Sequence, residues 1–215
     1  MRIIFGLSAI FLMSQAATAS QGEWYFRVLL DDMEIGHHRF LVTKRGAYEQ
    51  VISEASYDVR LLFIPVYRYR HSSLETWKDN CLVEIQSQTD DNGNQQFING
   101  SFQARMLHLT TKQGETRLQG CVKTFAYWDP AILKASRLLN TQTGQYTTVD
   151  TRFIANETLM INGKKVASRH YQLLMEKFTI DLWYARNDNR WLRLESTTQS
   201  GASIKYELQE AGERS

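Results

Sequence analysis

Apolar and polar residues alternate with a period of two along most of this chain, which is the pattern of strands that bury one face and expose the other. Turn sequences such as Asp90–Gly93 and Asn162–Gly163 separate the alternating runs and favour tight hairpins. The spacing predicts roughly ten to twelve strands, several of them long. We therefore expect a mainly β fold, built as a strongly curved antiparallel sheet or a partly open β-barrel.

One segment departs from this alternation. Asp129 is a good N-cap because its carboxylate can accept hydrogen bonds from the first turn of a helix, and Pro130 suits the first helical position. In the run "AILKASRLLN" that follows, one helical face is apolar apart from a serine and consists of Ile132, Leu133, Ser136 and Leu139. The pattern predicts one short helix, which is the natural plug for the concave face of a curved sheet.

The first nineteen residues carry the features of a secretory signal peptide. Arg2 supplies a positive charge, Ile3–Met13 is an apolar run too short to span a bilayer, and Ala17–Ala19 is a small-residue cleavage signal. An uncleaved anchor is the alternative, which the short apolar run disfavours. We predict a signal peptide over residues 1–19 and a single β-rich domain over residues 20–215. The mature protein would then be soluble, periplasmic or secreted, without a transmembrane segment.

Charge narrows the range of partners. The chain has 25 Lys and Arg against 23 Asp and Glu, and only Arg2 would leave with the signal peptide. The remaining charges nearly balance and are interspersed. This composition is atypical of a nucleic-acid-binding protein and of a surface that is strongly attracted to membranes.

The chain contains two cysteines, Cys81 and Cys121. In an exported protein, an even number of cysteines favours a disulfide over two free buried thiols. The chain-entropy model assigns roughly 4 kcal/mol of stabilisation to a bridge that closes a loop of this length.

One predicted strand carries most of the candidate chemistry. In "VYRYRHSSLETW", Arg68 and Arg70 would point to solvent, and the alternate positions would point inward. The inward set consists of Tyr67, Tyr69, His71, Ser73, Glu75 and Trp77. Two interpretations remain open: the wall of a ligand cavity, or an aromatic core whose polar tips find partners within the protein.

Catalytic and metal motifs are not visible in the sequence. On one strand His71 and Glu75 would lie about 13 Å apart, too far for a direct acid–base pair. The adjacent His37 and His38 would point to opposite faces of a strand, and no metal-binding spacing of His or Cys occurs. We therefore expect no metal site, no cofactor and no assignable catalytic residue.

Several segments resemble a known family. The blocks "DDMEIGHHRFLV", "VYRYRHSSLETWKDNCL", "GCVKTFAYWDPAIL" and "RLLNTQTGQY" are similar to the DUF6134 family of exported bacterial proteins of unknown function, which is similar to the DUF3108 group. The resemblance covers nearly all of the chain after the signal peptide, and both cysteines stand within matching blocks. One position departs from it, because Ala185 stands where the family pattern has an aspartate.

The resemblance implies a curved antiparallel sheet similar to the half-barrels of periplasmic lipoprotein carriers and sensors, whose concave faces bind acyl chains. We therefore expect a non-enzymatic carrier of a lipid or another apolar ligand, with Tyr127 and Trp128 near the mouth of its cavity. One alternative is an envelope interaction or assembly protein that uses a sheet edge or the helix. Another is a lipid-modifying enzyme with His71 and Glu75 in separate roles.

Overall fold

The computed structural model describes residues 21–61, 63–197 and 201–209. The predicted signal peptide, residues 1–19, lies outside these ranges. Thirteen strands of the described chain form one antiparallel sheet. They are β1 (Gln21–Leu30), β2 (Met33–Arg45), β3 (Tyr48–Leu61), β4 (Ile64–Lys78), β5 (Cys81–Asp91), β6 (Asn94–Gln103), β7 (Met106–Thr111), β8 (Gly114–Gln119), β11 (Asp150–Ile161), β12 (Lys164–Leu174), β13 (Thr179–Ala185), β14 (Trp191–Thr197) and β15 (Ser203–Leu208).

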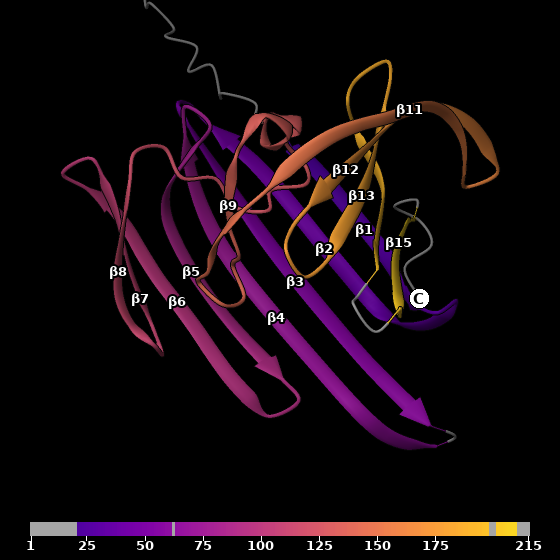
Figure 1. Ribbon diagram of the computed structural model, residues 1–215, viewed down its shortest axis with the longest axis horizontal. Coiled ribbons are helices and arrows are strands. Elements are labelled where there is room, and N and C mark those ends of the chain that lie inside the picture. Colours follow the sequence, from indigo (N-terminus) through magenta and orange to yellow (C-terminus); the bar gives the residue numbers. More distant parts are fainter. Residues whose placement is uncertain (1–20, 62, 198–200, 210–215) are drawn as a thin grey trace, which may run out of the picture.

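The strand order is a meander that is joined in the middle. Strands β1 to β8 follow one another across one half of the sheet, and β11 to β15 follow one another across the other half. The two halves meet where β15 pairs with β1, through partners such as Val28 and Tyr206. Figure 1 shows the magenta strands β5–β8 at one end of the sheet and the orange strands β11–β13 at the other.

The mainly β, antiparallel prediction is confirmed, but the sheet is neither closed nor strongly curled, so the expected strong curvature and partly open barrel are wrong. A barrel would need its two edge strands, β8 and β11, to approach each other and pair. Here the chain between them instead crosses one face of the sheet. Alternation along single strands fixes which side chains face inward, but it carries no information on whether edges meet.

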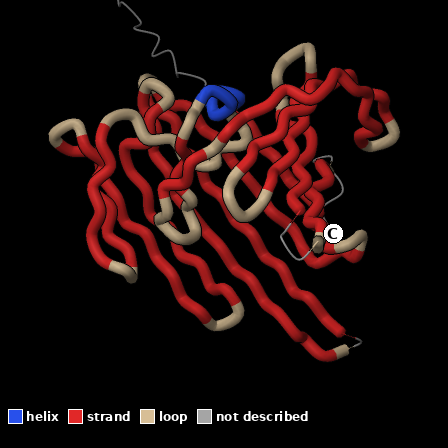
Figure 2. Tube along the Cα trace, viewed as in Figure 1, coloured by secondary structure: helices blue, strands red, loops and turns tan. Residues whose placement is uncertain are grey.

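The crossing chain, residues 121–149, is called the covering segment below. It contains a short 3₁₀ helix, η1 (Pro130–Lys134), and a two-stranded sheet of β9 (Arg137–Leu139) and β10 (Tyr146–Thr148). In Figure 2 this helix, in blue, is the one helical element among the red strands of the described chain.

The predicted helix starts at the expected residue but has a different type and length. Asp129 caps it as predicted, since its Oδ1 accepts a hydrogen bond from the backbone N–H of Ala131 at 2.9 Å. The helix is 3₁₀ rather than α, and it ends at Lys134 because Ala135 takes an extended conformation. Leu138 and Leu139 then form β9 and are both fully buried. Their burial by the sheet outweighs the helical spacing of this run.

The main hydrophobic core lies between the sheet and the covering segment. Trp128 packs against Phe40 of β2 and edge-on against Trp77 of β4, with ring centroids 5.7 and 6.2 Å apart. At the other half of the sheet, the hydroxyl of Tyr184 on β13 donates to the backbone carbonyl of Tyr127 at 2.9 Å. The covering segment therefore joins both halves of the sheet on one face.

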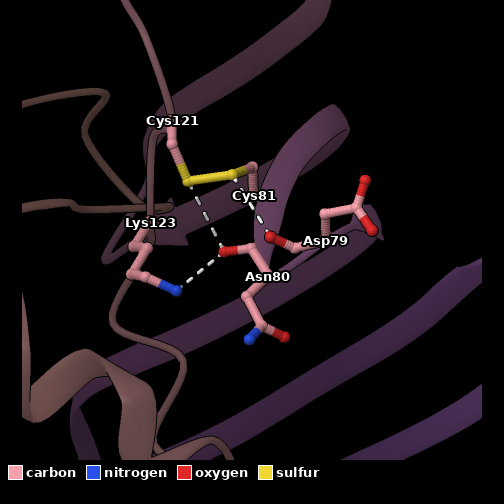
Figure 3. Close-up of a disulfide and its surroundings, with 5 residues drawn as sticks. All are labelled: Asp79, Asn80, Cys81, Cys121 and Lys123. Atoms are coloured by element: carbon pink, nitrogen blue, oxygen red, sulfur yellow. Dashed lines mark hydrogen bonds between the residues drawn. A yellow bond between two sulfur atoms is a disulfide. The ribbon is translucent and has the colours of Figure 1, made fainter.

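The predicted disulfide is present between Cys81, at the start of β5, and Cys121, at the start of the covering segment (Figure 3). Two further contacts tie the same place together. The backbone N–H of Leu82 donates to the carbonyl of Val122 at 2.9 Å, and Lys123 Nζ donates to the carbonyl of Asn80 at 2.7 Å. A disulfide is consistent with an oxidising, extracytoplasmic location. Among the residues that the structure places, no helix has the length and apolar character needed to cross a bilayer.

Candidate functional site

The predicted alternation along β4 is confirmed. Its inward side chains are buried and contact the core, whereas Arg68, Ser72 and Leu74 between them are exposed. The buried inward set is Tyr69, His71, Ser73, Glu75 and Trp77, and Tyr67 is half-buried. Strand β4 therefore presents two phenol rings, an imidazole, a carboxyl and an indole to the covered face of the sheet.

A cavity of about 310 Å³ lies between this face and the covering segment. Of the predicted site residues, His71, Glu75, Tyr127 and Trp128 line it. The rest of its wall combines polar side chains with aromatic and aliphatic ones, the latter from Phe40, Phe125, Phe178, Ile180, Leu194 and Ile204. The structure thus brings together four of the predicted residues from two segments that are distant in the sequence.

The other three predicted residues lie outside this cavity. Trp77 is buried beside it and donates from Nε1 to Glu75 Oε2 at 3.1 Å. Tyr69 stacks on Tyr57 and lines a second cavity of about 330 Å³, and its buried hydroxyl has no hydrogen-bond partner among the described residues. Tyr67 lies further along the β3–β4 hairpin, where its hydroxyl donates to Asp91 at 2.7 Å.

Glu75 is buried and surrounded by hydrogen-bond donors. Its Oε2 accepts from Thr124 Oγ1 at 3.0 Å and from Trp77 Nε1, and its Oε1 accepts from Ser73 Oγ at 3.4 Å. Burial raises the pKa of Glu75 to about 7, although these three hydrogen bonds act in the opposite direction. The carboxyl is therefore divided between its neutral and charged forms near neutral pH.

His71 has one ring nitrogen available to the cavity. Its Nδ1 is hydrogen-bonded to Thr89 Oγ1 at 2.9 Å, while Nε2 has no partner within the described part of the chain. Burial lowers the pKa of His71 to about 4, so the ring is neutral at physiological pH. A neutral imidazole can donate or accept one further hydrogen bond at Nε2, depending on its tautomer.

A second polar cluster on the same wall joins strands β2, β3 and β15. His38 of β2 is hydrogen-bonded through Nε2 to Ser53 Oγ at 2.7 Å and through Nδ1 to the Tyr206 hydroxyl at 3.0 Å. Tyr57 is hydrogen-bonded to Tyr206 at 2.5 Å. Burial holds the pKa of His38 well below its usual range, with smaller contributions from His71 and His37. This histidine is neutral as well.

Sequence reasoning missed this second cluster. Alternation in "HHRFLV" places His38 on the same face as Phe40 and Val42, and "IKYEL" likewise turns Tyr206 inward. These patterns identify inward-facing residues. They do not show that His38 and Tyr206 are in contact, because that contact depends on the pairing of β15 with β1.

A third histidine, His170, has both ring nitrogens occupied on the opposite face of the sheet. Its Nδ1 is bonded to Glu157 at 2.9 Å and its Nε2 to Asp181 at 2.6 Å, and the ring stacks on Trp183 at 4.2 Å between centroids. Because Ile180 faces the cavity, the alternation turns Asp181 away from it. With no free ring nitrogen, His170 is positioned as a cross-link between β11, β12 and β13.

The cavity offers both apolar surface and hydrogen-bonding groups to a ligand. It combines an apolar wall with uncharged imidazoles, hydroxyls and one carboxyl of raised pKa, all of which can hydrogen-bond. Within the described ranges, no group of three or more His, Cys, Asp or Glu side chains is arranged to hold a metal ion.

Comparison with known proteins identifies a family without a stated activity. The model described as "Domain of unknown function (DUF6134)" matches residues 26–209, which span the sheet and the covering segment. No curated protein matches the chain.

Proposed function

The chain belongs to the DUF6134 family, and we propose that it is a non-enzymatic binding protein of the bacterial envelope that holds a lipid or another small amphipathic molecule between its sheet and its covering segment. The bound part would be a single apolar chain or ring with one uncharged polar group. The disulfide and the predicted signal peptide both favour an extracytoplasmic site of action.

Size and wall chemistry support this class of ligand. Cavities for small molecules are commonly about 300–1,000 Å³, so the volume of about 310 Å³ is at the lower end of that range. A single chain or ring suits this volume better than a whole two-chain phospholipid. Aromatic and aliphatic side chains from strands β2, β13, β14 and β15, from Phe178 and from the covering segment supply the apolar contact.

Electrostatics favour a neutral polar group on the ligand. His38 and His71 are uncharged, and Glu75 ionises only near pH 7, so no fixed positive charge compensates an anionic head group. Burying an unpaired charge in such surroundings is costly. The observation that carries the proposal is the Nε2 of His71, which has no hydrogen-bond partner in the described chain and belongs to a cavity wall that also presents the Glu75 carboxyl among aromatic and aliphatic side chains.

The test is mass spectrometry of organic extracts from protein purified from its native envelope. We expect one neutral, single-chain lipid or amphiphile in near-stoichiometric amount. Thr141→Trp, which adds bulk at the cavity wall, should abolish co-purification. Thr148→Trp is the matched control, because Thr148 is exposed on the same segment.

Identical extracts from the wild type and Thr141→Trp would contradict the proposal. A lipid recovered in chemically altered form only from the wild-type protein would instead favour the enzyme alternative with His71 and Glu75 as reacting groups.

A further inference from the structure

The β3–β4 hairpin extends beyond the rest of the sheet. The pairing of β2 with β3 ends at Tyr57, and the pairing of β4 with β5 ends at Tyr69. Beyond these residues the two strands pair with each other, while the backbone carbonyl of Arg68 also accepts from the Asn92 N–H at 2.8 Å, and Figure 1 shows them extending at the lower right of the molecule. At about 3.3 Å per residue, four unsupported residues of β3 project roughly 13 Å.

The end of this hairpin is apolar and exposed. Phe63 is 93% exposed, Ile64 66% and Val66 50%, and the exposed Pro65 lies between the last two. Phe63 is the most exposed of the large hydrophobic side chains that the structure describes. Single exposed apolar residues are ordinary, but three clustered on one protruding tip indicate a surface that acquires a partner.

The shape of the tip favours immersion over docking against one side. Ile64 and Val66, two residues apart on β4, share one face of the ribbon, whereas Phe63 lies in the turn at its very end, so the apolar side chains cover both a face and the end of the hairpin. Pro65 also lacks a backbone N–H, which weakens this end as a template for adding a strand from another chain. An apolar medium such as the interior of a bilayer can surround the tip and bury all of these side chains at once.

Cationic side chains stand directly behind the apolar end. From Asp58 to Arg70 the hairpin carries three arginines and one aspartate, a net charge of +2. Arg70 pairs with Asp58 at 2.7 Å, and Arg68 lies 3.9 Å from Asp90 with 60% of its side chain exposed. Arg60 is exposed and has no ionic partner in the described chain. Arg60 and Arg68 are placed to meet phosphate groups.

We propose that this tip docks on a phospholipid bilayer, with Phe63, Ile64 and Val66 in the boundary between head groups and acyl chains and Arg60 and Arg68 at the lipid phosphates. The polar layer on each side of a bilayer is roughly 5–8 Å thick, so a projection of roughly 13 Å crosses it without burying the sheet. The nearly balanced net charge of the whole chain does not oppose docking, because only the hairpin tip contacts the bilayer. Docking is independent of what the cavity binds.

Vesicle co-sedimentation tests the proposal, with mixed phosphatidylcholine–phosphatidylglycerol vesicles as the probe. The wild-type protein should sediment with the vesicles, and Phe63→Ser combined with Ile64→Ser should weaken binding at least about 100-fold, since each large apolar side chain contributes about tenfold or more. Arg60→Glu should weaken binding by about fivefold and remove part of its salt dependence. Met160→Ser is the matched control, because Met160 is an apolar residue on another hairpin with an exposure close to that of Ile64.

Circular dichroism verifies that the variants fold, which is expected because the tip lies outside the main sheet pairing. Wild-type protein that stays in the supernatant, or a double variant that binds like the wild type, overturns the proposal. So does self-association of the wild type without vesicles that the double variant abolishes, since the tip would then bind a second copy. Thr141→Trp should bind vesicles normally, which separates this result from that of the cavity.

Discussion

At the scale of single residues, the buried carboxyl of Glu75 distinguishes this protein from one with an ordinary aromatic core. Three side chains donate hydrogen bonds to it, yet desolvation raises its pKa to about 7. An inert core position would more simply hold an apolar or amide side chain, because burying an acid of this kind costs stability whenever it ionises. The retained carboxyl is consistent with a polar anchor for a ligand.

This raised pKa predicts a specific pH dependence of stability. The folded-state pKa lies above the unfolded value of 4.5, so the native protein holds the proton more tightly. The contribution of Glu75 to stability is therefore fully present below pH 4.5 and is lost as pH rises through 7. Relative to Glu75→Gln, the wild type should lose about 3 kcal/mol of unfolding free energy between pH 4 and pH 8.

Urea denaturation of both proteins across this range measures the difference. His71, whose lowered pKa removes stability as pH falls from 6.5 through 4, remains in both proteins and largely cancels. Glu84→Gln, at an exposed position of β5, should show no such trend. A pH-independent difference between the wild type and Glu75→Gln would mean that Glu75 titrates normally.

The sequence was sufficient to assign inward and outward positions along β4, because a half-buried strand shows its period directly. It placed His71 and Glu75 on one face, and it placed Tyr127 and Trp128 close to them. It could not bring His38, Tyr57 and Tyr206 together, since their meeting requires three strand pairings between residues far apart in the chain. It also could not show that Tyr67 lies in the projecting hairpin.

At the scale of elements, the covering segment determines whether a cavity exists. It is held at one end by the Cys81–Cys121 disulfide and further along by Ser87 Oγ, which donates to the carbonyl of Thr141 at 2.7 Å. The N-cap at Asp129 was predictable because capping depends on neighbouring residues alone. The change from helix to strand after Lys134 was not, because it depends on how Leu138 and Leu139 pack against the sheet.

Removing the disulfide should destabilise the protein without unfolding it. The two cysteines are 40 positions apart, and the chain-entropy model gives about 2–4 kcal/mol for the loss in Cys81→Ser with Cys121→Ser. Urea denaturation with and without reductant checks this, because reductant should weaken the wild type to the same degree and leave the double variant unchanged. Equal stability of the oxidised wild type and the double variant would show that the disulfide does not stabilise the fold.

At the scale of the whole molecule, one open sheet is covered on one face, and the cavity lies between the sheet and the covering segment. The mainly β class was predictable from alternation. That the sheet stays open was not predictable, because closure depends on whether the edge strands β8 and β11 meet. The covering segment occupies the face that a barrel would enclose, so the space that remains is small. We therefore expect the cavity of about 310 Å³ to select a neutral amphiphile rather than to act as a broad lipid groove.

The most direct test of the cavity is a fluorescence titration with the neutral probe N-phenyl-1-naphthylamine. The wild type and Thr148→Trp should bind one equivalent saturably, and Thr141→Trp should bind at least about tenfold more weakly, since filling a packed site commonly costs 1–3 kcal/mol. At pH 7, 1-decanol should displace the probe more effectively than decanoate, because the cavity offers no positive charge. Binding that does not saturate, or that is equal in Thr141→Trp and the wild type, would contradict a ligand cavity between the sheet and the covering segment.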